Sequence, residues 1–467
     1  MGKTGLDKTT SAATAFGDAK EKAIVVGGGA AGMMAAIMLS ERGFETTLLE
    51  KNEKLGKKLF ITGKGRCNFT NDCEPDIFFE NVVSNPRFLY SALYGLTPQD
   101  VISLFESWGL ETKVERGQRA FPASDHAYDV IDCLKRQLKK AGVRVELNTE
   151  VTGLLTSGEA DGGPGLKSSE DSARLRVTGV RTRNKAYSAD RVIIATGGLS
   201  YPTTGSTGDG YKWAESLGHT IVPCRPSLVA LTCAEHDLAA LQGLTLKNVS
   251  FTVKPLTDPN GENTGNTRDG ENGRNGKNSK KKRRSLYSGF GEMLITHFGV
   301  TGPLVLTASA RCGRALEEGP LAGSIDLKPA VPADDLDRDL TGFLAENANR
   351  DCLHAIRPLY PASFVPVLLD RAGIPAHKKA HDITREERAA LVSVTKNFLV
   401  TLTGLRGYNE AVITQGGVSV KEVDPGTMAS KMADNLYFAG EVLDVDALTG
   451  GFNLQIAWAT GAAAGRA

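Results

Sequence analysis

The glycine-rich segment at residues 23–32 constrains the fold of this chain more than any other feature. It begins with four apolar residues, as in a buried parallel strand, and small residues typical of a closely packed helix follow. Its glycines fit G-x-G-x-x-G, in which Gly27 allows the tight turn, Gly29 lets a pyrophosphate approach and Gly32 lets the helix pack on the strand. The segment therefore predicts a Rossmann-type dinucleotide site rather than a glycine-rich turn that only packs. Its candidate ligand contacts are Gly27, Gly29, Ala30, Ala31 and Gly32.

The residue that ends the second apolar run, Glu50, indicates which dinucleotide binds. Residues 46–49 have the pattern of a strand, and Glu50 follows directly. A carboxylate at this place accepts hydrogen bonds from the ribose hydroxyls of an adenosine and repels a 2′-phosphate. We therefore expect FAD or NAD rather than NADP, with Lys51 and Val151 as further candidate contacts.

A loop at residues 62–71 has glycines around two cations, Lys64 and Arg66. Such a loop can wrap a pyrophosphate or the edge of a flavin. The alternative is a surface loop whose glycines serve only turns. The candidate contacts in this loop are Gly65, Arg66, Cys67 and Asn68.

Two later regions of the chain favour FAD over NAD. The apolar run at 192–195 leads into Thr-Gly-Gly, which places bare backbone at the carboxyl end of a strand. Near the C-terminus, a strand pattern ends in Gly440 and Glu441, which suits contacts to a ribityl chain, and a helix opens at 449–453. The N-terminus of that helix would stabilise negative charge on a reduced flavin. NAD-binding proteins do not need a C-terminal segment that returns to the dinucleotide-binding domain. The candidates here are Thr196, Gly197, Gly198, Gly440, Glu441, Asp444, Gly451, Phe452 and Asn453.

The order of strand and helix patterns predicts an α/β protein with several domains, as expected for 467 residues. We expect a Rossmann-like, two-part FAD-binding domain at 21–222 plus 415–467, interrupted by a β-rich, barrel-like domain at 223–332 plus 398–414. Residues 228–231 are one of its expected strands. A small helical subdomain is expected at 333–397, where Thr384 and Glu387 fit a capping box. Residues 1–20 and the low-complexity loop 257–285 are expected to be disordered.

Charge and cysteine usage narrow the classes of partner and compartment. The net charge of +1 gives no overall electrostatic attraction to nucleic acid or to an anionic membrane. No apolar run approaches the ~18 residues that span a bilayer. The basic run at 280–284 is more typical of a solvated loop tip than of a nucleic-acid contact. Seven scattered cysteines without C-x-x-C indicate a reduced, cytoplasmic protein, and no histidine spacing suggests a metal site.

These motifs together resemble one family, the BaiN/YhiN-type flavoproteins, also called aminoacetone oxidase-like FAD-binding enzymes. The resemblance is carried by residues 27–32, 63–71, 121–125, 195–198, 204–211, 295–303, 414–418 and 440–461. It implies FAD, a β-rich inserted domain and a small helical domain. The residues it implies near FAD are Glu50, Arg66, Cys67, Thr196, Gly197, Glu441 and Asn453. The loop 257–285 is longer and more basic than is usual in such proteins.

Candidate groups for catalysis are fewer. His297 could protonate a substrate or the flavin, although a buried, hydrogen-bonded histidine is the alternative. Cys67 and Cys73 could form a redox pair, although they bracket a segment that reads as a turn. Because only one dinucleotide fingerprint is present, NAD(P)H would have to dock transiently against the flavin.

The leading hypothesis is an FAD-dependent oxidoreductase in which NAD(P)H reduces an unsaturated or carbonyl small molecule. One alternative is an FAD-dependent amine oxidase that produces hydrogen peroxide. Another is an FAD-holding module that binds RNA or acts as a scaffold. The oligomeric state stays open.

Overall fold

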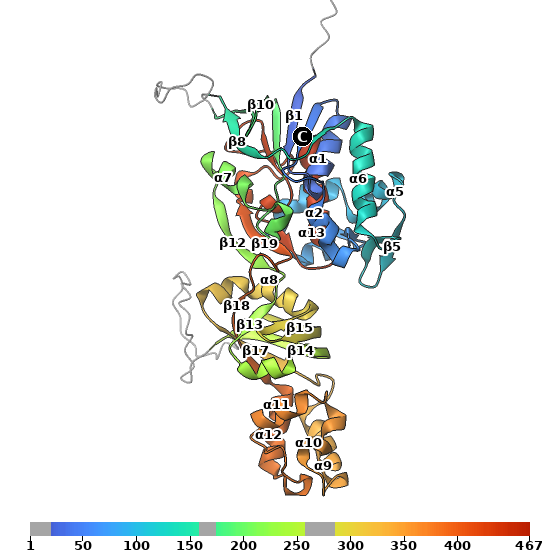
Figure 1. Ribbon diagram of the computed structural model, residues 1–467, viewed down its shortest axis with the longest axis vertical. Helices are drawn as coiled ribbons and strands as arrows, with labels where there is room; N and C mark the ends of the chain where they lie inside the picture. The colour runs from blue at the N-terminus through green and yellow to red at the C-terminus, as the bar shows by residue number, and fades with distance from the viewer. Residues whose placement is uncertain (1–19, 158–173, 257–284) are drawn as a thin grey trace, which may run out of the picture.

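The computed structural model describes residues 20–157, 174–256 and 285–467. Nearly all of the predicted tail and of the predicted disordered loop therefore lies outside the described residues. Figure 1 shows three lobes along the long axis of the molecule. The chain passes through the upper, middle and lower lobes, then returns to the upper lobe to end near β1 (Lys22–Val26).

A five-stranded parallel sheet forms the centre of the upper lobe. Its strand order is β20-β11-β1-β2-β7, with every neighbouring pair parallel. The other strands are β2 (Glu45–Leu49), β7 (Arg144–Glu146), β11 (Arg191–Ile194) and β20 (Leu436–Phe438). Strand β20 comes from the C-terminal part of the chain and pairs with β11. The Rossmann-type sheet therefore needs both ends of the sequence.

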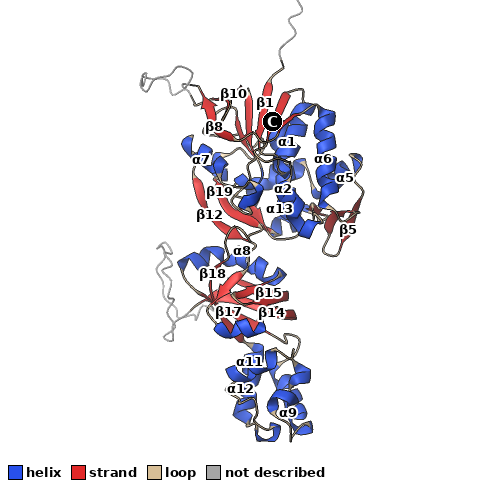
Figure 2. Ribbon diagram, in the orientation of Figure 1, coloured by secondary structure: helices blue, strands red, loops and turns tan. Residues whose placement is uncertain are grey.

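Two helices with small residues join these ends. Helix α1 (Ala30–Glu41) packs on α13 (Phe452–Arg466), and Figure 2 shows them together beside the sheet. A Cβ added to Gly461 would lie 2.5 Å from the carbonyl oxygen of Ala31, so this crossing requires a glycine. The close approach fixes the beginnings of both helices relative to the sheet edge.

The upper lobe contains further helices and strands around this sheet. The helices are α2 (Lys57–Ile61), α3 (Pro75–Glu80), α4 (Tyr90–Gly95), α5 (Pro98–Ser107), α6 (Ala127–Ala141) and α7 (Asp209–Ser216). The strands are β3 (Thr70–Asn71), β4 (Val82–Ser84), β5 (Thr112–Glu115), β6 (Arg119–Pro122), β8 (Val151–Thr156), β9 (Val177–Thr182), β10 (Ala186–Ser188) and β21 (Asp446–Ala447).

The middle lobe is a closed six-stranded barrel with the order β13-β16-β15-β14-β17-β18. Its strands are β13 (Leu231–Cys233), β14 (Thr245–Pro255), β15 (Tyr287–Thr296), β16 (Gly299–Thr301), β17 (Leu321–Asp326) and β18 (Phe398–Leu405). Helix α8 (Pro303–Glu318) lies between the barrel and the upper lobe (Figure 1). The predicted fold class, an α/β Rossmann-type protein with a barrel-like insert, is confirmed.

The strand expected at 228–231 is wrong in its bounds. The chain instead forms β12 (Ile221–Ser227), which pairs with β19 (Ile413–Val418) outside the barrel. Leu228 then adopts a φ of 52°, a left-handed conformation that a continuous strand does not tolerate. The barrel strand β13 begins only at Leu231.

The lower lobe contains the helices α9 (Ala333–Glu346), α10 (Cys352–Ala355), α11 (Phe364–Arg371) and α12 (Arg385–Lys396). The capping box predicted at the start of α12 is confirmed, because Glu387 N–H donates to Thr384 Oγ1 and Thr384 N–H donates to Glu387. Phe364 packs on Phe398 of the barrel with ring centres 4.9 Å apart. The exact domain boundaries stay a prediction. Within the described part of the chain, no helix is long and apolar enough to cross a membrane.

Candidate active site

A cavity of about 650 Å³ opens at the carboxyl edge of the parallel sheet. It is lined by the residues at or just beyond the ends of β1, β2, β11 and β20, which are Val26, Leu49, Ala195 and Ala439. Ligands of open α/β sheets bind at this edge. The cavity therefore lies where the glycine-rich segment predicted a dinucleotide.

The three glycines of the fingerprint have separate structural roles. Gly27 has a φ of +107°, and a Cβ there would lie 2.5 Å from the carbonyl oxygen of Ala195. A Cβ on Gly32 would lie 1.9 Å from the carbonyl oxygen of Gly27. A Cβ on Gly29 would meet no protein atom within 4 Å. The fold requires Gly27 and Gly32, whereas Gly29 faces open space in the cavity.

Two helix N-termini open into this cavity. Helix α1 begins after Gly29 and α13 begins after Gly451, and neither cap residue has a side chain that could accept the free N–H groups. Neither first turn contains an acidic residue. Free N–H groups and the positive ends of two helix dipoles favour negative charge in the ligand.

Two buried polar atoms beside the cavity have no partner among the described residues. They are Thr196 Oγ1 and Asn68 Oδ1. A buried acceptor without a donor costs free energy, so these atoms fit a site completed by a polar ligand. The open cradle, the two helix ends and these two atoms fit a flavin dinucleotide.

The carboxylate of Glu50 lines the cavity and is held in place from behind. Gly28 N–H and Asn52 N–H each donate to it at 2.8 Å. Each carboxylate oxygen accepts more than one hydrogen bond, so capacity is left for ribose hydroxyls. Lys51, the adjacent candidate, forms an ion pair with Asp209 at 2.8 Å.

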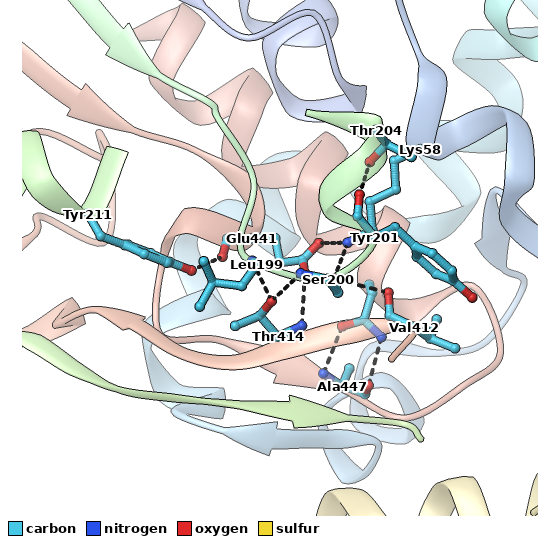
Figure 3. A network of polar contacts seen from close by, with 11 residues as sticks. Lys58, Leu199, Ser200, Tyr201, Thr204, Tyr211, Val412, Thr414, Glu441 and Ala447 are labelled. Carbon is cyan, nitrogen blue, oxygen red and sulfur yellow. Dashed lines mark hydrogen bonds and ion pairs between the residues drawn. The ribbon is translucent and has the colours of Figure 1, made fainter. Parts of the chain in front are cut away.

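Glu441 is the centre of a network that joins three parts of the cavity wall (Figure 3). Lys58 Nζ lies 2.6 Å from its carboxylate, and Ser200 Oγ and Thr414 N–H donate to it at 2.8 and 2.9 Å. Thr414 Oγ1 in turn accepts from Leu199 N–H at 2.8 Å. Glu441 therefore positions the wall as well as lining it. The sequence interpretation missed Lys58, which lies in a lysine-rich helix start that no motif covers.

Asn453 also acts on the protein itself. Its amide donates to the carbonyl of Ala447 at 2.7 Å and accepts from Ala447 N–H at 2.9 Å. These bonds hold the loop that precedes α13, so Asn453 fixes the helix start that faces the cavity.

The candidate contacts divide into those that line the cavity and those that do not. The lining set is Gly27, Gly29, Ala30, Ala31, Glu50, Lys51, Arg66, Asn68, Val151, Thr196, Gly197, Gly440, Glu441, Gly451 and Asn453. The residues that do not line it are Gly32, Gly65, Cys67, Gly198, Asp444 and Phe452. Asp444, for example, accepts from Asn85 at 2.9 Å, and Phe452 packs on Phe78.

The two candidate catalytic residues lie away from the open cavity. Cys67 is fully buried, and burial raises the pKa of its thiol to about 12, which disfavours a thiolate. His297 is exposed on the turn between β15 and β16 and does not line the cavity. In the part of the chain that the structure describes, no cluster of His, Cys, Asp or Glu could hold a metal ion.

A second, apolar half of the cavity lies toward the barrel. Its lining comes from the turn after β12, from α8 and from the segment before and into β19: Leu228, Pro303, Leu306, Val412 and Ile413. The sequence interpretation assigned none of these residues to the site, although Pro303 ends a segment that carries the family resemblance. They come from three distant segments of the chain. A cavity with one glycine-rich half and one apolar half can hold a dinucleotide and a second molecule.

The comparisons with known proteins agree with this geometry. The family described as "HI0933-like protein Rossmann domain" matches residues 21–467. The chain belongs to this family. The 3-dehydro-bile acid Δ(4,6)-reductase of Clostridium scindens is 32% identical over 95% of this chain and 98% of the relative. The resemblance stated from the motifs is thereby confirmed.

Other relatives carry a different name. The ribosomal RNA dihydrouridine synthases of Haemophilus influenzae and Escherichia coli are each 29% identical over 94% of this chain, covering 96% and 95% of the relatives. A solved 3-ketosteroid-Δ4-(5α)-dehydrogenase from Rhodococcus jostii RHA1 aligns at 14% identity with a TM-score of 0.47, over 98% of this chain and 97% of that chain. Family membership and the dinucleotide cavity together make this chain an FAD-dependent oxidoreductase.

Proposed function

We propose that this family member uses NAD(P)H to reduce a carbon–carbon double bond conjugated with a carbonyl group in a largely apolar acceptor. The observation that carries this proposal is the two-part cavity. Leu228 and Leu306 place an apolar wall opposite the dinucleotide half. Such a wall favours a flat, apolar acceptor and excludes water from the reacting bond.

The names of the relatives support this class of reaction. One name describes reduction of the double bonds of a 3-oxo bile acid, and the other describes saturation of the uracil ring of uridine. In both cases the double bond is conjugated with a carbonyl. The acceptor gains a hydride and a proton while the nicotinamide is oxidised.

The chain's own residues would set the conditions for this reaction. Bound FAD would supply two-electron hydride chemistry. The N-terminus of α13, fixed by Asn453, would stabilise negative charge on the reduced cofactor. The Glu441–Lys58 pair would keep the wall rigid.

Tyr201 is the proposed proton donor in place of His297. It lines the cavity, and Figure 3 shows its ring pointing away from the Glu441–Lys58 pair. Its hydroxyl has no hydrogen-bond partner within the described residues. Its φ of 51° is unusual for a bulky residue, and such strain clusters at functional sites. In a Tyr201→Phe variant we expect slower reoxidation by an enone and unchanged bleaching by NAD(P)H.

Anaerobic stopped-flow spectroscopy of the FAD-loaded protein tests the proposal. NADH or NADPH should bleach the flavin, and an α,β-unsaturated ketone should restore its colour. Bleaching by aminoacetone instead, with peroxide formed in air, would establish the amine oxidase alternative. If neither NADH, NADPH nor aminoacetone bleaches the flavin, the alternative of an FAD-holding scaffold or RNA-binding module is favoured.

A second candidate acceptor is uridine within ribosomal RNA. It is favoured by the names of the two 29%-identical relatives. Reoxidation of the reduced flavin by a uridine-containing RNA fragment, but not by a steroid enone, would identify uridine as the acceptor. In either case the reaction reduces a conjugated double bond.

A further inference from the structure

The charged residues around the cavity are not all neutralised. Six Lys or Arg side chains among the described residues line it. Four of them have carboxylate partners, which are Asp209 for Lys51, Glu53 for Lys57, Glu441 for Lys58 and Asp125 for Arg66. The other two, Lys64 and Arg119, have no ion pair or side-chain hydrogen bond to any described residue.

These two cations belong to one side of the cavity. Arg119 begins β6, and Phe121 lies two positions along the same strand, so both side chains point to the same face. A Cβ added to Gly63, the neighbour of Lys64, would lie 3.8 Å from the Phe121 ring. The wall thus combines an aromatic ring with two cations that lack partners in the described protein.

The backbone that holds Lys64 is strained. Gly63, Lys64 and Gly65 have φ values of 57°, 58° and 86°. A lysine is less favourable than a glycine in this left-handed conformation, because its Cβ crowds the backbone. No hydrogen bond or ion pair of its side chain with a described residue offsets this cost. Strain of this kind is retained where a function over-determines the position.

We propose that Lys64 and Arg119 bind a phosphate group of the ligand that docks beside the FAD half of the cavity. Guanidinium and ammonium groups are the usual protein partners of phosphate. The Arg66 guanidinium, which stacks on the Phe121 ring 4.2 Å from its centre, adds positive charge to the same wall. The phosphate belongs either to the nicotinamide dinucleotide donor or to a nucleotide acceptor. This inference rests on the proposed function only for the choice between these two sources.

The test uses the full-length, FAD-loaded protein with Lys64→Ala, Arg119→Ala and the double substitution. The matched control is Arg116→Ala, because Arg116 is an exposed arginine in the same β5–β6 hairpin that does not line the cavity. The first readout is titration with inorganic pyrophosphate, followed by the flavin absorbance without turnover. The second is the concentration dependence of anaerobic bleaching by NADH and NADPH. The third is reoxidation by a steroid enone or by a uridine oligonucleotide.

We expect the double variant to bind pyrophosphate about tenfold more weakly, with a weaker dependence on salt, and Arg116→Ala to behave as the parent. If the substitutions weaken the binding of NAD(P)H but not that of the oligonucleotide, the phosphate belongs to the donor. If they weaken the binding of the oligonucleotide but not that of NAD(P)H, the phosphate belongs to the acceptor. The charge-conserving Lys64→Arg and Arg119→Lys variants should retain most of the binding.

The proposal is overturned if pyrophosphate, NAD(P)H and the oligonucleotide all bind the folded, FAD-containing double variant as tightly as the parent. If neither NAD(P)H nor any acceptor changes the flavin of the parent protein, the proposed function fails instead. The pyrophosphate titration still tests the phosphate site in that case.

Discussion

Gly29 is the position at which the requirements of the fold and of the cofactor can be separated. Its φ of −82° and ψ of −169° suit any residue, and no protein atom lies within 4 Å of an added Cβ. We expect Gly29→Val to fold normally and to bind FAD more than about tenfold more weakly, because the side chain would occupy the pyrophosphate position. FAD content and thermal unfolding of the purified protein measure the two effects.

The neighbouring Gly27 is the control for this prediction. Gly27→Ala should lower the thermal midpoint, because its φ of +107° and its contact with Ala195 leave no room for a Cβ. Normal FAD content in folded Gly29→Val protein would show that the open space does not hold the pyrophosphate.

Asp446 is a residue whose burial should affect stability. Its side chain is 1% exposed, one carboxylate oxygen lacks a partner among the described residues, and burial raises its pKa from 3.8 to about 6. An acid with a raised pKa in the folded state favours folding only while it is protonated. Its contribution is therefore lost as pH rises from about 4 to 6, by about 3 kcal/mol in total.

Asp446→Asn removes this titration, because the amide stays neutral. The free energy of unfolding of the variant, relative to the parent, should thus increase across this pH range. Denaturant titrations from pH 4 to 8 measure the difference. A difference that stays constant with pH would mean that Asp446 titrates normally.

At the scale of elements, the connection between β14 and β15 should be dispensable. The two strands pair antiparallel up to Val253 and Tyr287, and Leu286 N–H donates to the carbonyl of Val253 at 2.9 Å. The ladder is therefore complete without residues 257–284. Replacing them with a short Gly-Ser turn should leave FAD content and the thermal midpoint nearly unchanged, because the paired residues of both strands stay in place.

Val253→Pro provides the contrast, since Val253 is buried and pairs with both β15 and β17. It should lower the thermal midpoint by breaking the barrel ladder. Loss of flavin on replacing the loop alone would show that the loop contributes to the site.

At the scale of the whole molecule, the apolar half of the cavity depends on how the barrel and α8 meet the upper lobe. Leu306 of α8 and Leu228 form part of a small apolar cluster at this junction. Leu306→Ala should weaken the binding of an apolar acceptor roughly tenfold, because it removes apolar contact area. FAD content and the bleaching of the flavin by NAD(P)H should be unchanged. Leu399→Ala, at a barrel position that is 59% exposed, is the matched control.

The apparent KM for an enone acceptor in steady-state assays measures this effect. If Leu306→Ala changes bleaching by NAD(P)H and not the enone KM, the apolar half serves the donor rather than the acceptor.

The sequence by itself determined the Rossmann-type half of the site. Gly27, Gly29 and Gly32 lie within one short segment, and their spacing alone specifies a turn, an open approach and a close packing contact. The Thr384–Glu387 capping box was predictable for the same reason, because capping is a local hydrogen-bond pattern. Such features depend on neighbours a few residues away.

Only the tertiary structure decided the partners of Glu441 and the second half of the cavity. Lys58 and Glu441 are 383 positions apart in the chain, and Leu228 and Leu306 meet only because β12 and α8 connect the barrel to the upper lobe. The strand expected at 228–231 also failed there, since Leu228 takes a left-handed conformation at this junction. Contacts between distant segments follow from how whole elements pack, and no local pattern of residues encodes that packing.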